Sequence, residues 1–223
     1  PSNNFCTMNL LDNFYTVNSF ANGNDTVITS SSGYSGAVAT LGMSSGKYYF
    51  EFKPISKTGD NDEYGVGITG EPIVSVNQPS WKMATGYEYV GQTGNVVNND
   101  NQTSFGNTYT AGDIIGVAVD VTNNKLYFSK NGVWQNSGDP TSGATGTGAF
   151  SLTAASSTTT GAYIPTCSFA ANSASATMAF NFGNGYFQTS AVSSAGTGAS
   201  TPGTFEYDVP TGYQPLTTKG LNV

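Results

Sequence analysis

The most apolar run in the sequence, residues 112–121, limits what this chain can fold into. Its alternate positions are non-polar on both faces, with Ile115, Val117, Val119 and Val121 on one and Ile114, Gly116 and Ala118 on the other. Such a strand belongs in the interior of a β structure, covered on each side. Residues 125–130 then alternate as a half-buried strand does, and Asn131-Gly132 favours a type I′ hairpin turn. Residues 112–134 are therefore predicted to form three consecutive antiparallel strands at the centre of an all-β sandwich.

Other strands and loops are predicted from the same kinds of pattern. In residues 47–53, Tyr48, Phe50 and Phe52 are expected to point inward, and Tyr49 and Glu51 outward. Further candidate strands are residues 37–41, 64–68, 162–169 and 176–182. Segments rich in Gly, Ser, Thr and Ala are expected to be loops, long ones at 135–161 and 188–204 and a shorter one at 30–36.

Several of these segments resemble motifs of a known family. Residues 112–121 followed by 126–132 resemble the strand-and-hairpin signature of the SPRY family, and residues 45–52, 64–68 and 179–183 resemble three of its other motifs. The resemblance covers roughly residues 37–183. It implies a single bent antiparallel β-sandwich, a concanavalin-like jelly roll. It also implies a binding module whose loops at one end recognise a partner and which has no catalytic residues.

One domain accounts for a chain of 223 residues. Residues 1–36 are predicted to be a lead-in that packs on the sandwich, and residues 37–187 the sandwich itself. Residues 188–223 are predicted to be a flexible loop followed by an extended C-terminal segment that closes the domain. Pro210 and Pro215 stiffen that segment, which also carries aromatic residues that can lie along a sheet edge.

The charge balance excludes several classes of function. Only 9% of the residues are charged, the net charge is −7, and the sequence holds neither Arg nor His. Nucleic-acid binding and attraction to an anionic membrane surface both need basic residues, so neither is expected, and no apolar run is long enough to insert in a membrane. Without His, a nucleophile lacks its usual base and zinc lacks its usual ligands. We expect no enzymatic activity and no cofactor.

Cys6 and Cys167 are the only cysteines, and two interpretations of them remain open. A disulfide between them would close a long loop and stabilise the fold by about 5 kcal/mol in the chain-entropy model. Alternatively, both are buried thiols that act as small hydrophobic residues, which we favour because nothing else resembles a disulfide framework.

Acidic residues gather in one loop and flank one strand. Asp60, Asp62 and Glu63 are closely spaced oxygen ligands that could hold Ca²⁺, although an ordinary solvated loop is the preferred interpretation. Asp113 and Asp120 are expected to cap the turns at the two ends of the central strand.

Candidate binding residues lie where strands are predicted to meet loops. The aromatic candidates are Tyr64, Trp81, Tyr87, Tyr89 and Trp134, and the polar ones are Asn98, Asn99, Asp100 and Asn101. Aromatic rings beside amide and carboxylate groups suit the recognition of sugars, because a ring covers the apolar face of a pyranose while the polar groups bond its hydroxyls. The alternatives are core packing for the aromatic residues and an ordinary solvated turn for residues 98–102.

The two ends of the chain carry a second, looser resemblance. Residues 6–11 and 205–216 are similar to the ends of SPRY-like proteins encoded by tailed bacteriophages and marine viral genomes. This resemblance implies a protein at the virion surface, either a capsid decoration or head-fibre protein or a tail-fibre module. Its partners would be other virion proteins and a host-surface glycan or protein. The alternative is a cellular or secreted SPRY module that binds carbohydrate or protein.

Overall fold

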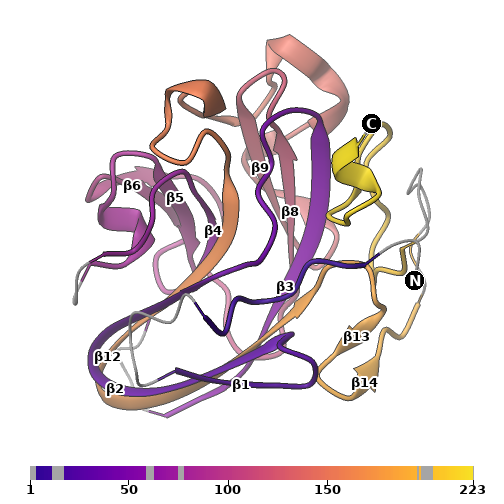
Figure 1. Cartoon of the computed structure of the whole chain (residues 1–223). Coiled ribbons are helices and arrows are strands. Elements are labelled where there is room, and N and C mark those ends of the chain that lie inside the picture. Colours follow the sequence, from indigo (N-terminus) through magenta and orange to yellow (C-terminus); the bar gives the residue numbers. More distant parts are fainter. Residues whose placement is uncertain are drawn as a thin grey trace.

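The computed structural model describes residues 4–11, 18–58, 63–74, 78–194, 196 and 203–222. Its strands form two layers packed face to face across one core (Figure 1). The main strands are β1 (Asn18–Ala21), β2 (Thr26–Val38), β3 (Lys47–Lys57), β4 (Glu63–Thr69), β5 (Gly86–Val90), β6 (Asn95–Asn98), β7 (Asn101–Ser104), β8 (Ile115–Asp120), β9 (Lys125–Lys130), β10 (Val133–Trp134) and β12 (Ile164–Asn181). The short strands are β11 (Phe150–Ser151), β13 (Tyr186–Phe187), β14 (Ser190–Ala191) and β15 (Gln214–Pro215). The predicted all-β antiparallel sandwich is confirmed.

Strands β2 and β12 belong to both layers. The first half of β12 pairs with β4, and its second half pairs with β3, while β2 follows β12 along most of its length. One layer therefore runs β10-β9-β8-β3-β12-β2-β1, and the other runs β2-β12-β4-β5-β6-β7. Two predictions are wrong here: a loop at residues 30–36 and a gap between strands at residues 170–175. The first stretch lies inside β2 and the second inside β12. Pairing of β2 with β12 supplies the ladder hydrogen bonds that outweigh the low strand propensity of Gly, Ser and Ala.

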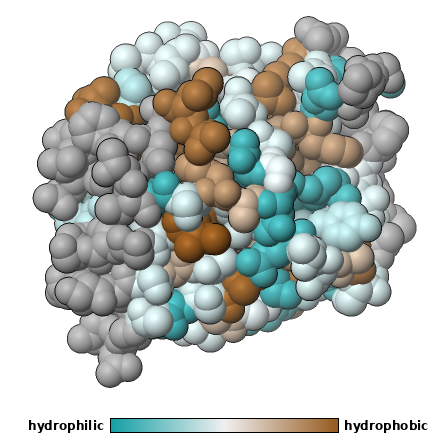
Figure 2. Space-filling model, turned by 60° about the horizontal axis from the view of Figure 1, so that its bottom comes forward, coloured by the Kyte–Doolittle hydropathy of each residue, from teal (hydrophilic) through white to brown (hydrophobic). Residues whose placement is uncertain are grey.

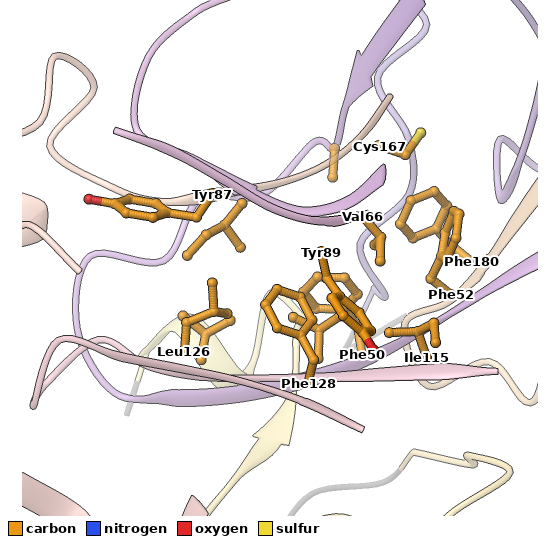
Figure 3. Packing of buried hydrophobic residues seen from close by; sticks show 14 of the residues in the cluster. Phe50, Phe52, Val66, Tyr87, Tyr89, Ile115, Leu126, Phe128, Cys167 and Phe180 are labelled. Carbon is orange, nitrogen blue, oxygen red and sulfur yellow. The ribbon is translucent and has the colours of Figure 1, made fainter. Parts of the chain in front are cut away.

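The three strands predicted at the centre of the sandwich are present as β8, β9 and β10. Val117 and Val119 are completely buried, and the inward direction predicted for Tyr48, Phe50 and Phe52 is confirmed. Figure 3 shows the rings of Phe50, Phe52, Phe128 and Phe180 between the two layers, with Tyr89 among them. Burying this much aromatic surface is the main stabilising contribution of the core.

The outer face of β3 and β8 is covered as well. Tyr49 of β3 and Ala118 of β8 pack against Phe205, Val209 and Tyr213 of the C-terminal segment, which we define as residues 203–222. In Figure 1 this segment, drawn in yellow, lies beside β3, with which β15 pairs in parallel. Tyr49 and Glu51 were expected to point outward; they do face away from the core, but the C-terminal segment leaves neither exposed.

The segments between strands are held by short 3₁₀ helices and side-chain caps. These helices are η1 (Ser80–Lys82), η2 (Gln135–Ser137), η3 (Pro140–Thr145), η4 (Ala155–Ser157) and η5 (Gly220–Asn222). As predicted, Asp113 and Asp120 hold turns: Thr110 N donates to Asp113 Oδ2 at 2.9 Å, and Asn123 N donates to Asp120 Oδ1 at 2.9 Å. The face in Figure 2 carries hydrophobic and hydrophilic residues side by side. None of the helices in the described part of the chain is long and apolar enough to cross a membrane.

Cys6 and Cys167 are free and fully buried in the core. Burial raises the pKa of Cys6 to about 11 and that of Cys167 well above its usual value, so neither carries a reactive thiolate at neutral pH. A thiol reagent is therefore expected to react with no cysteine in the folded protein, and with both after denaturation without a reductant. Recovery of fewer than two thiols from the denatured chain would contradict this structure.

Candidate functional site

Three of the aromatic binding candidates are core residues. Tyr64 is 2% exposed, Tyr87 3%, and Tyr89 0%, and all three belong to the main core cluster. Figure 3 shows Tyr87 and Tyr89 with their rings in the packing between the layers. A ring enclosed in this way cannot cover the face of a ligand, so the assignment of Tyr87 and Tyr89 to a binding surface is corrected to core packing. The physical reason is that Tyr87 and Tyr89 alternate inward on β5, opposite Ile68 and Val66 of β4. Tyr64 packs in the same core but also lines a separate cavity of about 300 Å³.

Trp81 and Asp100, one of the polar candidates, come together around one cavity, which we call the hairpin cleft. It has a volume of about 290 Å³. Its lining residues are Tyr34, Trp81, Lys82, Val90, Thr93, Val97, Asp100 and Gln102. Trp81, Val90 and Val97 form a buried apolar cluster at this place. Among the polar and charged lining residues, Lys82 comes from η1, Thr93 from the turn before β6, and Asp100 and Gln102 from the hairpin made by β6 and β7.

The hairpin turn is attached to η1 and to the residues that follow it by a set of hydrogen bonds. Asn98 Nδ2 donates to the carbonyl oxygens of Ala84 at 3.0 Å and Gly86 at 2.8 Å. Asp100 N donates to Trp81 O at 3.1 Å. Asn99 and Asp100 have φ angles of 50° and 60°, as a type I′ turn requires, and are exposed. Asn98 therefore positions the cleft, whereas Asn99, Asp100 and Asn101 stand at its solvent side.

Of the residues that line the cleft, only Trp81 and Asp100 were predicted as site residues, and two of those that were missed, Tyr34 and Lys82, contact each other. Tyr34 of β2 packs edge-on to Trp81, with ring centroids 5.7 Å apart and planes at 84°. The ammonium of Lys82 lies 4.3 Å from the centroid of the Tyr34 ring, within cation–π range. Tyr34 comes from a Gly/Ser-rich stretch that the sequence pattern assigned to a loop. Only the pairing of β2 with β12 brings it beside Trp81.

A buried carboxyl group lies beneath η1. Glu88 is completely buried, accepts a hydrogen bond from Ser168 Oγ at 2.7 Å, and is also bonded by the hydroxyl of Ser80. Its other oxygen, Oε2, has no hydrogen-bond partner among the described residues. Burial raises the pKa of Glu88 to about 8. A Cβ at Gly65 would stand 2.1 Å from Glu88 Oε2, so glycine at that position makes room for the carboxyl group. The sequence feature that could have indicated this buried group is a single acidic residue, Glu88, between two tyrosines of one strand.

Strand β7 forms an open edge of its layer beside the cleft. Among the described residues it pairs with β6 alone, and its four residues are all exposed. Since Asn98 and Asn101 flank a two-residue turn, Asn101 and Thr103 direct their backbone groups toward β6. The N–H and C=O groups of Gln102 and Ser104 consequently point away from the sheet. The strand carries no charge and no proline, the usual devices that protect an edge.

The remaining candidates lie elsewhere. Trp134 ends β10, far along the chain from the hairpin cleft, and packs against the Tyr49 ring at 6.5 Å between centroids. Asp60 and Asp62 lie outside the described residues, as does the side chain of Glu63. Within the described ranges, no group of three or more His, Cys, Asp or Glu side chains could hold a metal ion.

Comparisons with known proteins agree with the fold. The family model described as "SPRY domain" matches residues 47–185. The SPRY domain of human HERC1 superposes with a TM-score of 0.54 at 19% identity, covering 74% of this chain and 92% of that domain. A second human SPRY domain gives 0.51 at 14% identity, covering 74% and 94%. At such identities the likeness concerns the fold alone.

Relatives of known name share a shorter stretch. The Ran-binding proteins 9/10 homolog of Drosophila melanogaster is 40% identical over 91 residues, which cover 40% of this chain and 9% of that protein. Human Ran-binding protein 9 is 34% identical over 88 residues, which cover 39% and 12%. These relatives are cellular Ran-binding proteins. The predicted virion surface location, and virion and host-surface partners, are therefore wrong; the similarity of the chain ends to phage proteins was too loose to indicate a source.

Proposed function

Because the chain belongs to the SPRY domain family, we propose that it is a protein-interaction module that binds an extended segment of a partner protein without catalysing a reaction. In this proposal the partner's backbone pairs with the open edge of β7, and one of its side chains enters the hairpin cleft. The observation that carries the proposal is the juxtaposition of an unprotected strand edge with a cavity that Gln102 also lines. Backbone pairing supplies affinity in such complexes, and the adjacent pocket supplies specificity.

A role in binding rather than catalysis is supported by the chemistry of the chain. The sequence holds no His to act as a base. Its buried carboxyl groups are enclosed by protein: Glu88 lies beneath η1, and Glu51 lies beneath the C-terminal segment. General acid–base catalysis needs such groups in reach of a substrate. The cellular relatives, which are named for binding another protein, also support a protein partner.

The test is to select binding peptides from a random display library and measure their affinity for variants of the edge. Gln102→Pro removes the outward N–H group and should weaken the selected peptides by about tenfold or more, since a lost backbone bond also leaves its partner unpaired. Gln102→Ala keeps that N–H group and should bind within about threefold of the unaltered protein. Ser104→Pro provides the same test at the second outward position, if Gln102→Pro proves unstable.

Nuclear magnetic resonance mapping provides the control for location. The amide signals of Gln102 and Ser104 should shift when a selected peptide is added. Peptides that bind Gln102→Pro and Ser104→Pro as tightly as the unaltered protein, or that shift only signals distant from β7, would refute edge pairing.

A further inference from the structure

A second cavity lies between the segment after β10 and the C-terminal segment. We call it the Trp134 groove; its volume is about 480 Å³. Its lining residues are Trp134, Gly138, Asp139, Pro140, Thr141, Asp208, Val209, Pro210 and Thr211. It shares no residue with the hairpin cleft. The groove is therefore a candidate binding site separate from the hairpin cleft.

The walls of the groove are fixed by contacts outside it. Tyr213 Oη donates to Pro140 O at 3.1 Å, which joins the C-terminal segment to the start of η3. Trp134 packs edge-on to Tyr49, and Tyr49 packs edge-on to Phe205 with ring centroids 5.0 Å apart. Two prolines, Pro140 and Pro210, restrict the backbone of the two walls. A groove built in this way is preformed, so a ligand loses little affinity to the ordering of the protein.

The charged side chains among the described residues that line the groove are acidic. Asp139 and Asp208 both line it and are exposed, and none of the described residues that line it is basic. Asp139 Oδ1 accepts hydrogen bonds from Thr141 N at 2.9 Å and from Thr141 Oγ1 at 2.6 Å. These bonds lower the pKa of Asp139, so its carboxylate is charged at neutral pH. The chain as a whole carries a net charge of −7, which adds to the attraction of a cation.

Beside the two carboxylates stands an apolar surface. Trp134 is only partly buried, and Val209 and the two prolines extend that surface along the groove. An arginine side chain matches both features, because its planar guanidinium stacks on an aromatic ring and forms paired bonds to carboxylates. Lysine satisfies the charge but not the planar stacking.

We propose that the Trp134 groove binds an arginine-bearing extended segment of a partner protein, with the guanidinium placed between Trp134 and the carboxylates of Asp139 and Asp208. Charge complementarity selects the basic segment, and the aromatic wall selects arginine over lysine. This site goes beyond the pairing proposed for β7 and does not depend on it. The two sites share no residue, so a substitution can remove one and leave the residues of the other unchanged.

The probe is a set of hexapeptide pools in which Arg is fixed at one position and the others are randomised. Peptides from the best pool are resynthesised with citrulline in place of Arg, which keeps the shape and removes the charge. The indole N–H signals of the two tryptophans report binding, and Trp134→Phe assigns them. We expect the Arg peptides to shift the Trp134 signal, and the citrulline peptides to bind at least about tenfold more weakly.

Variants of the protein separate a specific site from general attraction. Asp139→Asn with Asp208→Asn should weaken the Arg peptides by about tenfold or more, whereas Glu71→Gln, at a partly exposed acid that lines neither cavity, should change affinity by less than about twofold. The substitution Asp139→Asn keeps an oxygen that can accept the bonds from Thr141, and Glu71→Gln keeps one that can accept the bonds from Thr85. Equal weakening by Glu71→Gln, or failure of every Arg pool to shift the Trp134 signal, would overturn the proposal. The Gln102→Pro variant should bind the Arg peptides normally, so that failure of this site and failure of β7 pairing are distinguishable.

Discussion

The free energy of unfolding is expected to fall as the pH is raised from about 5 to about 9, and the substitution Glu88→Gln is expected to remove much of that fall. Burial raises the pKa of Glu88 to about 8, and it raises those of Glu51 and Asp25 to about 7. In the unfolded chain these carboxyl groups have ordinary pKa values near 4.

The sign follows from proton binding by the two states. Between about pH 4 and pH 8 the folded protein holds protons that the unfolded chain has already released. The stabilisation from the neutral carboxyl groups is therefore complete below the unfolded pKa and is lost as the pH rises through the folded values. For Glu88, a fully buried group, the loss at about pH 9 is on the order of 5 kcal/mol.

Chemical denaturation at a series of pH values measures this effect. At about pH 9, Glu88→Gln should be more stable than the unaltered protein by on the order of 5 kcal/mol, because an amide fills the same space without ionising. Its side chain can still bond Ser168 and Ser80. If Glu88→Gln retained the full slope, the buried carboxyl group would not be its source.

The substitution Glu51→Ala is expected to lower the free energy of unfolding by about 3–5 kcal/mol. Glu51 Oε2 accepts from Glu206 N at 2.9 Å and Asn181 Nδ2 at 3.1 Å, and Oε1 accepts from Tyr207 N at 2.9 Å. Removing the carboxyl group leaves these donors without an acceptor in a buried place. The C-terminal segment should then detach more often from the outer face of β3.

Two measurements check this prediction. Denaturant unfolding gives the loss of stability, and limited proteolysis should show faster cleavage within residues 203–222. The matched control is Tyr49→Phe, which removes the Tyr49 hydroxyl, bonded to Glu51 Oε1 at 3.2 Å and to Ser129, but keeps the carboxyl group, and should cost about 1 kcal/mol. A loss for Glu51→Ala no greater than that of the control would show that the carboxyl group does not hold the segment.

The candidate site could be predicted only in part. Trp81 and Asp100 line one cavity, as predicted binding residues should. They could be predicted because a strand end and a tight turn leave a pattern in the local sequence. The burial of Tyr64, Tyr87 and Tyr89 was not readable, since an aromatic residue near a predicted strand end has the same local pattern whether it faces a loop or the core. Tyr34 and Lys82 were missed because their contact joins residues far apart in the chain. The binding roles of Asn99, Asp100, Asn101 and Trp134 stay predictions, as do the domain boundaries.

Local sequence was sufficient to predict the central strands, the inward faces of β3 and β8, and the family. The alternation of apolar and polar residues and the hairpin turns that indicate them each arise within a few residues. Only the tertiary structure decided which elements cover the outer faces. Tyr49 and Glu51 read as solvent-facing, and they are buried because a segment more than 150 residues later folds over them. The same applies to β2 and β12, whose Gly- and Ser-rich stretches become strands through pairing with each other. Such contacts depend on the energy of long-range pairing and burial, which no short window of residues contains.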